Sequence, residues 1–364
     1  MRVKRCMSMS RDKTNRGRGA VSNPTGRYER YQRVPLDDGW EDYGDDLPIV
    51  QTTVLPEQTR TIIARNDSPD VPFDRSINPY KGCEHGCIYC FARVTHAYLG
   101  LSPGIDFESR IFSKPNAAKL LEKELARPGY RCEVLVLGAN TDPYQPVEKR
   151  LRITRSILEV LAEHEHPVGI VTKSNLVLRD IDVLGPMAEK RLVHVMLSLT
   201  TLDRELARNM EPRAPTPERR IQTLSALVES GIPVGVLASP MIPGLNDSEM
   251  ESILKASAMA GADSAGYILI RLPLELKELF TEWLDTHYPT KTSRVLQLIR
   301  DAHEGKLYEP QFGRRMRGSG RYADLLEKRF QVACRRLGLG ARDTPLDTSR
   351  FRVPPRKSDQ MGLF

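Results

Sequence analysis

Cysteine is scarce in this chain, which has six cysteines among 364 residues. Such a low density excludes the disulfide-stapled scaffolds of small secreted proteins. Long hydrophobic runs are also lacking: no stretch approaches the roughly 20 apolar residues that cross a bilayer, and residues 1–20 include no apolar run of signal-peptide length. We therefore expect a cytoplasmic protein that makes no membrane contact and keeps its thiols reduced.

The net charge of +7 is unevenly spread along the chain. Residues 314–357 hold 13 Lys and Arg against 4 Asp and Glu, whereas residues 47–313 hold 31 against 34. A dense positive segment is typical of a surface that binds a polyanion, although a charge run is more often only a solvated face. Nucleic acid is therefore a candidate partner through residues 314–357.

The chain divides into three parts by composition. Residues 1–46 are rich in Arg, Gly, Ser and Asp with little apolar periodicity, which predicts a disordered charged extension. Residues 47–273 alternate short apolar runs with amphipathic segments, and residues 274–364 form a helical, basic carboxyl-terminal extension. The predicted strands are SINPYKG (76–82), CEVLVLGAN (132–140), PVGIVTK (167–173), LVHVMLSLT (192–200), IPVGVLASPMI (232–242) and SAGYILIRLP (264–273).

Near-continuous apolar strands separated by helices are typical of a parallel sheet covered on both faces. Six such units fall short of the eight that close a complete barrel. The sequence therefore predicts an α/β fold, a partial (β/α)6 barrel of the TIM type, with a doubly wound sheet as the alternative. In either fold, binding and catalytic groups gather at the carboxyl ends of the strands.

Half of the cysteines lie in one short stretch, KGCEHGCIYCFAR (81–93), as Cys83, Cys87 and Cys90. Clustered cysteines in a reducing compartment favour a metal site. A structural zinc site needs four ligands, so zinc would require His85, Cys132 or Cys334 as well. An iron–sulfur cube held by three thiolates would instead keep one iron open for a ligand.

The Cys83-x3-Cys87-x2-Cys90 spacing, with Tyr89 before the third cysteine and a strand before the loop, resembles the radical S-adenosylmethionine superfamily. The resemblance implies a 4Fe–4S cluster on the three thiolates, whose open iron chelates the methionine part of S-adenosylmethionine. Reduction by an external donor of the flavodoxin or ferredoxin type would then release a 5′-deoxyadenosyl radical. A partial (β/α)6 barrel is also the fold that this resemblance implies.

Four further stretches resemble one branch of that superfamily, which contains spore photoproduct lyase and proteins called DNA repair photolyases. They are GANTDPYQPVEK (138–149), VTKSN (171–175), MEPRAPTPERRI (210–221) and PMIPGLND (240–247). The branch implies a lyase-like enzyme. Spore photoproduct lyases carry a hydrogen-donating cysteine where the second strand ends, but here that strand ends in VLVLGANTD, and Cys132 lies at its start.

The same resemblance gives roles to polar residues at the ends of the second and third strands. Asn140, Thr141 and Asp142 would hold the amino group of S-adenosylmethionine, which needs oxygen acceptors. Lys173 would hold its carboxylate, because a Lys that follows five apolar residues is rarely buried without a partner. The alternatives are a turn at 140–142, which Asn, Asp and Pro favour, and a solvated strand end at Lys173.

Three more residues complete the expected site. Ser198, at the end of the fourth strand, would bind the ribose hydroxyls, and Tyr89 would pack against the adenine. Arg213 could reach a carboxylate or phosphate, or pair with Glu211 or Glu218. A different class of function stays open as well, namely a non-enzymatic nucleic-acid-binding module in which the cysteine loop holds zinc or an iron–sulfur group.

Overall fold

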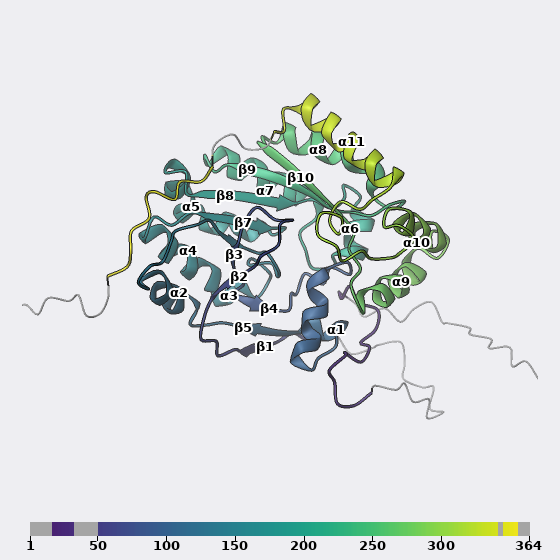
Figure 1. Ribbon diagram of the computed structural model, residues 1–364, viewed down its shortest axis with the longest axis horizontal. Coiled ribbons are helices and arrows are strands. Elements are labelled where there is room, and N and C mark those ends of the chain that lie inside the picture. The colour runs from purple at the N-terminus through teal and green to yellow at the C-terminus, as the bar shows by residue number, and fades with distance from the viewer. Residues whose placement is uncertain (1–16, 33–49, 341–344, 356–364) are drawn as a thin grey trace, which may run out of the picture.

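The computed structural model describes residues 17–32, 50–340 and 345–355 of the chain, and its ribbon is shown in Figure 1. A seven-stranded sheet has the order β10-β9-β8-β7-β6-β3-β2. Six of its strands are parallel, and only β2 (Ile63–Arg65) runs antiparallel, beside β3. The parallel strands are β3 (Arg75–Ile77), β6 (Leu135–Leu137), β7 (Val168–Thr172), β8 (Val193–Ser198), β9 (Val234–Met241) and β10 (Ser264–Leu269).

This strand order confirms the partial (β/α)6 barrel. The six parallel strands follow one another in space in the order of the sequence, as they do when every crossover helix lies on the same side of the sheet. A doubly wound sheet would reverse its order at a switch point, and none occurs. β2 and β10 form the two outer edges, so the barrel is open among the described residues.

The crossover helices cover the outer face of the sheet (Figure 1). α4 shows how the sequence builds them, since its buried side chains recur with helical spacing and face the strands. Thr216 begins α7 by accepting a hydrogen bond from the Arg219 N–H, a usual amino-terminal cap. The helices are α4 (Ile153–Glu163), α5 (Ile181–Glu189), α6 (Arg204–Met210), α7 (Pro217–Glu229) and α8 (Met250–Met259).

The front of the barrel differs from the prediction. The segment expected as one strand, residues 76–82, is split between two sheets, because Pro79 offers no N–H to continue a ladder. β3 belongs to the barrel, whereas β4 (Tyr80–Lys81) pairs with β5 (Arg110–Ser113), which also pairs with β1 (Thr53–Pro56). α1 (Ile105–Ser109) and α2 (Ala117–Leu125) flank β5, and the predicted helix after the cysteines is a 3₁₀ helix, η1 (Phe91–Leu99).

The prediction of a disordered extension over residues 1–46 is wrong for residues 17–32. Their backbone packs on the cysteine loop, where the Gly19 and Ala20 N–H groups donate to the buried Glu108 carboxylate at 2.9 and 2.8 Å. Arg18 is buried as well and donates to the Glu108 carbonyl. Charged side chains thus order this segment without an apolar core of its own, which composition did not reveal. Residues 1–16 and 33–46 lie outside the described residues.

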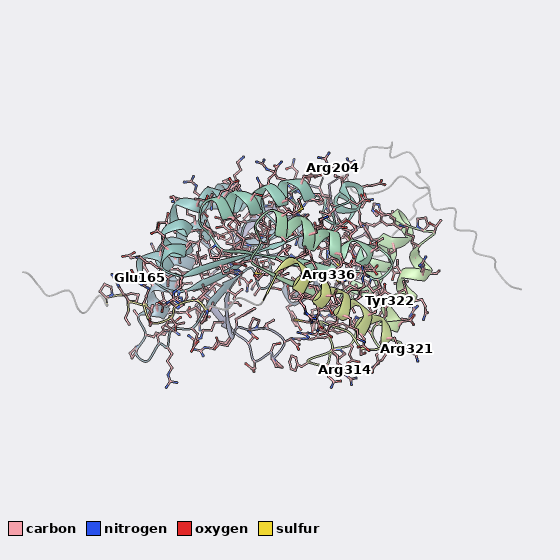
Figure 2. The ribbon with its side chains drawn as sticks, turned by 90° about the horizontal axis from the view of Figure 1, so that it is seen from above. Glu165, Arg204, Arg314, Arg321, Tyr322 and Arg336 are labelled. Carbon is pink, nitrogen blue, oxygen red and sulfur yellow. The ribbon has the colours of Figure 1, made fainter. Side chains whose placement is uncertain are left out.

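The carboxyl-terminal part is joined to the barrel. α9 (Leu276–His287), α10 (Thr292–Asp301) and α11 (Arg321–Leu337) are helical as expected, and α11 buries Leu326 and Cys334 in one core with residues of α8 and β9. Arg321 and Tyr322 lie at the start of α11, next to Arg314, and Arg336 lies near its end (Figure 2). Residues 345–355 form no helix or strand and reach the turn that follows α4, where Phe351 contacts His166. No helix in the described ranges is long and apolar enough to cross a membrane.

Candidate cofactor site at the barrel mouth

The three cysteines lie in a loop between β4 and η1, at the carboxyl end of the barrel. Cys83 and Cys87 are buried and Cys90 is partly exposed, and none of them forms a disulfide. Backbone bonds fix the loop at both ends, since the Cys83 N–H donates to the Phe107 carbonyl at 3.0 Å and the Ile88 N–H to that of Met210 at 3.0 Å. Positive φ angles of 77° at Gly82 and 68° at Gly86 let the loop turn tightly.

A buried arginine supports this loop from below. Arg93 donates to the carbonyls of Cys87 and Gly86 at 2.8 and 2.9 Å and to those of Pro103 and Gly104 at 3.1 and 2.9 Å. Its charge is balanced by Glu108, to which it also donates. Sequence reasoning missed Arg93. Its position three residues after Cys90, in a segment expected to be helical, is the signal that could have shown that it faces the loop.

The donor set fits a cluster bound by three thiolates. Cys83, Ala92 and Phe107 form a small apolar wall with Cys90 packed on it. Burial raises the pKa of the Cys87 thiol to about 12, with the Lys173 ammonium opposing the rise, so binding to iron would have to displace the proton. Among the described residues no three His, Cys, Asp or Glu side chains converge on one metal ion. Thiolates of a 4Fe–4S cluster bind different irons and surround a volume instead.

Lys173 brings a buried positive charge to this loop from the end of β7. Its side chain is 15% exposed, and its Nζ lies 4.0 Å from Glu211 Oε1 and 6.0 Å from the centre of the Tyr89 ring. Desolvation alone would lower the pKa of Lys173, but the Cys87 sulfur and the Glu211 carboxylate outweigh it and raise the pKa above its ordinary value. The ammonium is thus charged and near Cys87, and its carboxylate partner Glu211 is shared with Arg220.

Glu211 and Arg220, which the sequence analysis did not assign to the site, form the buried base of this charge cluster. Arg220 donates to Glu211 and, at 3.2 Å, to the Ser198 carbonyl. Although burial opposes ionisation, Arg220 and Lys173 lower the pKa of Glu211 to about 2. Tyr89 also donates its hydroxyl to Glu211. The sequence signal was two oppositely charged residues nine positions apart around a Pro-rich turn, which does not by itself indicate burial.

The predicted acceptors at 140–142 do lie together at the end of β6, but their contacts differ. Asp142 holds the end of β7, because its carboxylate accepts the Lys173 N–H at 2.9 Å and the Thr172 hydroxyl at 2.7 Å. The Thr141 hydroxyl donates to the Tyr80 carbonyl at 2.8 Å, and the Asn140 N–H donates to the Asn78 side chain at 3.0 Å. Asp142 therefore positions Lys173 directly.

The remaining predicted residues are placed as follows. Tyr89 is buried, with its hydroxyl 3.2 Å from the Thr200 hydroxyl, so its polar end points into the charge cluster. Ser198 is buried at the end of β8. Arg213 pairs with neither Glu211 nor Glu218; its guanidinium lies 3.2 Å from Glu84 Oε1, on the outer side of the cysteine loop.

The other candidate ligands are less suitably placed. His85 lies in the cysteine loop, and its Nδ1 is 3.3 Å from Asp142 Oδ2 at the end of β6. Cys132 precedes β6 at its amino end, and Cys334 lies in α11 and packs in a core with residues of α8. The Tyr144 hydroxyl, near the end of β6, donates to buried Asp180 at 3.1 Å.

Three relatives by sequence are described as uncharacterized proteins. An uncharacterized protein of Mycobacterium tuberculosis is 35% identical over 288 residues, covering 78% of this chain and 81% of the relative. An uncharacterized protein of Methanocaldococcus jannaschii is 31% identical over 173 residues, covering 48% and 62%. One from the Acidianus two-tailed virus is 29% identical over 197 residues, covering 52% and 64%.

Solved structures show the fold. Spore photoproduct lyase complexed with dinucleoside spore photoproduct superposes with a TM-score of 0.54 at 15% identity, covering 78% of each chain. A variant of that lyase with bound AdoMet and the same dinucleoside gives 0.55 at 16% identity and the same coverage. The family model described as the radical SAM superfamily matches residues 77–256, which span the cysteine loop and the strand ends around it. This chain belongs to the radical SAM superfamily.

Proposed function

We propose that this chain binds a 4Fe–4S cluster through Cys83, Cys87 and Cys90 and cleaves S-adenosylmethionine reductively beside it. The observation that carries the proposal is the Lys173 ammonium, buried beside the cysteine loop with a long contact of 4.0 Å to a Glu211 carboxylate that is also paired with Arg220. A buried charge needs a partner, and the carboxylate of the methionine moiety supplies one at this position. When bound, the cluster supplies the electron that breaks a sulfur–carbon bond and releases a 5′-deoxyadenosyl radical.

The surrounding residues have defined tasks in this proposal. Lys173 holds the carboxylate, Asp142 holds Lys173 in place through its backbone N–H, and Tyr89 closes the side toward Glu211. Oxygens of Asn140 and Thr141 remain at the end of β6 for the amino group, and Ser198 for the ribose. An external one-electron donor of the flavodoxin or ferredoxin type would reduce the cluster.

The substrate is proposed to be nucleic acid, with lyase-like chemistry. Supporting this are the likeness in fold to spore photoproduct lyase, whose solved structures include one with a dinucleoside product, and the basic composition of residues 314–357. The strand-end cysteine of those lyases is absent, so hydrogen return to a product radical would need another donor.

Anaerobic reconstitution followed by dithionite and S-adenosylmethionine tests the reaction. We expect a brown protein with about four irons that forms 5′-deoxyadenosine. Alanine at Cys83, Cys87 or Cys90 should abolish both iron and product, because a three-thiolate site has no spare ligand. Alanine at Cys132 or Cys334 should leave both unchanged, since those thiols lie elsewhere. Loss of iron from Cys132→Ala would contradict the assignment.

The alternative, a non-enzymatic metal-bound nucleic-acid module, predicts a colourless protein with one zinc and no 5′-deoxyadenosine. This alternative function also gives no role to the buried cluster of Lys173, Glu211 and Arg220. The iron and zinc content of the same preparation therefore separates the two functions.

A further inference from the structure

A cavity of about 570 Å³ opens on the outer side of the cysteine loop. This volume lies within the range of small-molecule sites. Its floor is apolar, formed by Val54, Pro146 and Val147, and Glu84 brings it within one residue of Cys83. The polar residues that line it are Thr52, Glu84, Lys149, Arg150 and Arg213.

Two cations on the rim of this cavity are rigidly placed. Lys149 and Arg150 lie on α3 (Glu148–Leu151), and both side chains are exposed. The helix is fixed from behind by Glu148, which is buried and accepts from Arg179 at 2.8 Å and from the Thr154 N–H at 3.0 Å. Neither Lys149 nor Arg150 forms an ion pair with an acidic side chain in the described part of the chain.

The third cation belongs to a network that keeps the cavity positive. Arg213 lies 3.2 Å from both Glu84 Oε1 and the Thr52 hydroxyl, so the carboxylate in the wall is already neutralised. Arg18 lies behind Thr52 and donates to its hydroxyl at 3.1 Å. Close to Glu84 there are thus two arginines, and the two rim cations add to this positive charge.

Several arginines of the basic carboxyl-terminal segment, in contrast to Lys149 and Arg150, form ion pairs with acidic side chains. Arg314 pairs with Glu304 and Arg317 with Glu327, both at 2.9 Å, and Arg315 pairs with Asp70. Part of the positive charge that made residues 314–357 a candidate is therefore balanced by local acids. Lys149 and Arg150, by contrast, are exposed cations without an ion pair among the described residues, and they line the cavity next to the cysteine loop.

We infer that this cavity binds a phosphate group of the substrate, held by Lys149, Arg150 and Arg213. Phosphate is the ligand that these side chains suit: Arg213 offers planar paired donors and Lys149 a point charge. A concave site suits a single phosphate better than the broad acidic face of an electron-carrier protein, which needs an area of several hundred Å². Only the position of this phosphate beside the cofactor depends on the proposed function.

The test is fluorescence anisotropy of a labelled single-stranded DNA oligonucleotide across a salt series, with the reconstituted protein. Lys149→Ser/Arg150→Ser should weaken binding about tenfold at low salt. The slope of log K against log salt should fall by about 1.4, because each phosphate contact to a single strand contributes about 0.7. The matched control is Lys119→Ser/Lys123→Ser on α2, which removes the same charge from two exposed lysines that do not line the cavity and should leave binding unchanged.

Two further measurements identify the source of the phosphate and distinguish a failure of this inference from a failure of the proposed function. If DNA does not bind, direct titration with inorganic pyrophosphate is the second arm: pyrophosphate binding that Lys149→Ser/Arg150→Ser weakens would assign the cavity to a phosphorylated small molecule, which still supports a phosphate site. Equal binding by both double variants would overturn the inference, as would slower cluster reduction by flavodoxin with DNA binding intact. Substrate-free cleavage of S-adenosylmethionine with dithionite should be unaffected in either variant, so its absence in the unaltered protein would refute only the proposed function.

Discussion

At the scale of single residues, the site depends on how charge is buried. Glu211, Arg220 and Lys173 are three ionised groups with at most 15% exposure. Burying charges costs several kcal/mol each unless they are paired. Arg220 and Glu211 pair directly, whereas the Lys173 ammonium lies 4.0 Å from Glu211 and is also attracted by the Asp142 carboxylate. This arrangement prepares the site for one further negative group, and the cofactor carboxylate is the group that fits the proposed function.

Replacing Lys173 with Met keeps the shape of the side chain and removes its charge. We expect full iron content and S-adenosylmethionine affinity reduced about ten- to a hundredfold, because one charge-assisted contact is worth roughly 1.5–3 kcal/mol. Equilibrium dialysis with labelled S-adenosylmethionine measures this, with Lys119→Met as the exposed control. Unchanged affinity would return Lys173 to the status of an ordinary strand end.

At the scale of elements, the cysteine loop is a structure built from distant segments. Arg93 of η1 binds four carbonyls in two loops, Glu108 of α1 balances its charge, and the backbone at Gly19 and Ala20 caps that carboxylate. The geometry of the thiols is therefore set before any iron binds. A change in this support should affect iron uptake without touching a ligand.

Arg93→Met should leave the Glu108 carboxylate buried and unpaired. Loss of one partner of a buried pair costs about 3–5 kcal/mol, so we expect a large drop in the urea midpoint together with low iron content. The double variant Arg93→Met/Glu108→Gln should recover part of the stability, because the uncompensated charge is gone. A double variant no more stable than the single one would contradict this account.

At the scale of the whole molecule, contacts bridge the two edges of the open barrel. Asp70, in the loop after β2, accepts the Gly313 N–H at 2.6 Å and pairs with Arg315, while the Met316 carbonyl accepts the N–H of Leu269 at the end of β10 at 2.8 Å. The carboxyl-terminal segment thus links both edges of the sheet. Segments from different predicted parts of the chain therefore pack against one another. Because these contacts are long-range, we treat the dependence of unfolding free energy on pH as a property of the whole molecule.

Two buried histidines make stability fall in mild acid. Burial lowers the pKa of both His96 and His166 to about 4, below the value of roughly 6.5 of an unfolded chain. As pH falls from about 6.5 to 4, these histidines are protonated in the unfolded state but not in the folded state. Each histidine therefore lowers the free energy of unfolding by about 2 kcal/mol at pH 5. Asp142 and Glu211, with pKa values of about 2, begin to contribute losses only as pH falls below about 5, and most of that loss comes at lower pH.

Urea midpoints at pH 7 and pH 5 measure this loss. In His166→Gln the difference between the free energies of unfolding at pH 7 and pH 5 should shrink by about 2 kcal/mol, since one of the two titrating groups is removed. An identical pH dependence in the variant and the unaltered protein would show that His166 does not titrate as its burial implies.

The sequence by itself predicted the family and the barrel, and it singled out the three cysteines that we propose as thiol ligands. Apolar runs of strand length, helices with one apolar stripe and a Cys-x3-Cys-x2-Cys spacing are local patterns, so neighbouring residues along the chain carry them. Lys173 could be singled out for the same reason, because a Lys directly after a buried strand is conspicuous in the sequence.

Only the tertiary structure decided which charges meet. Arg93 with Glu108, Arg220 with Glu211, and Lys149 and Arg150 with Arg213 are brought together by packing of separate elements, and a single sequence shows their charges without their burial. It also decided that residues 17–32 are ordered, since their partners lie some 90 positions away. Ion pairing depends on distance and desolvation in space, which local residue patterns do not record.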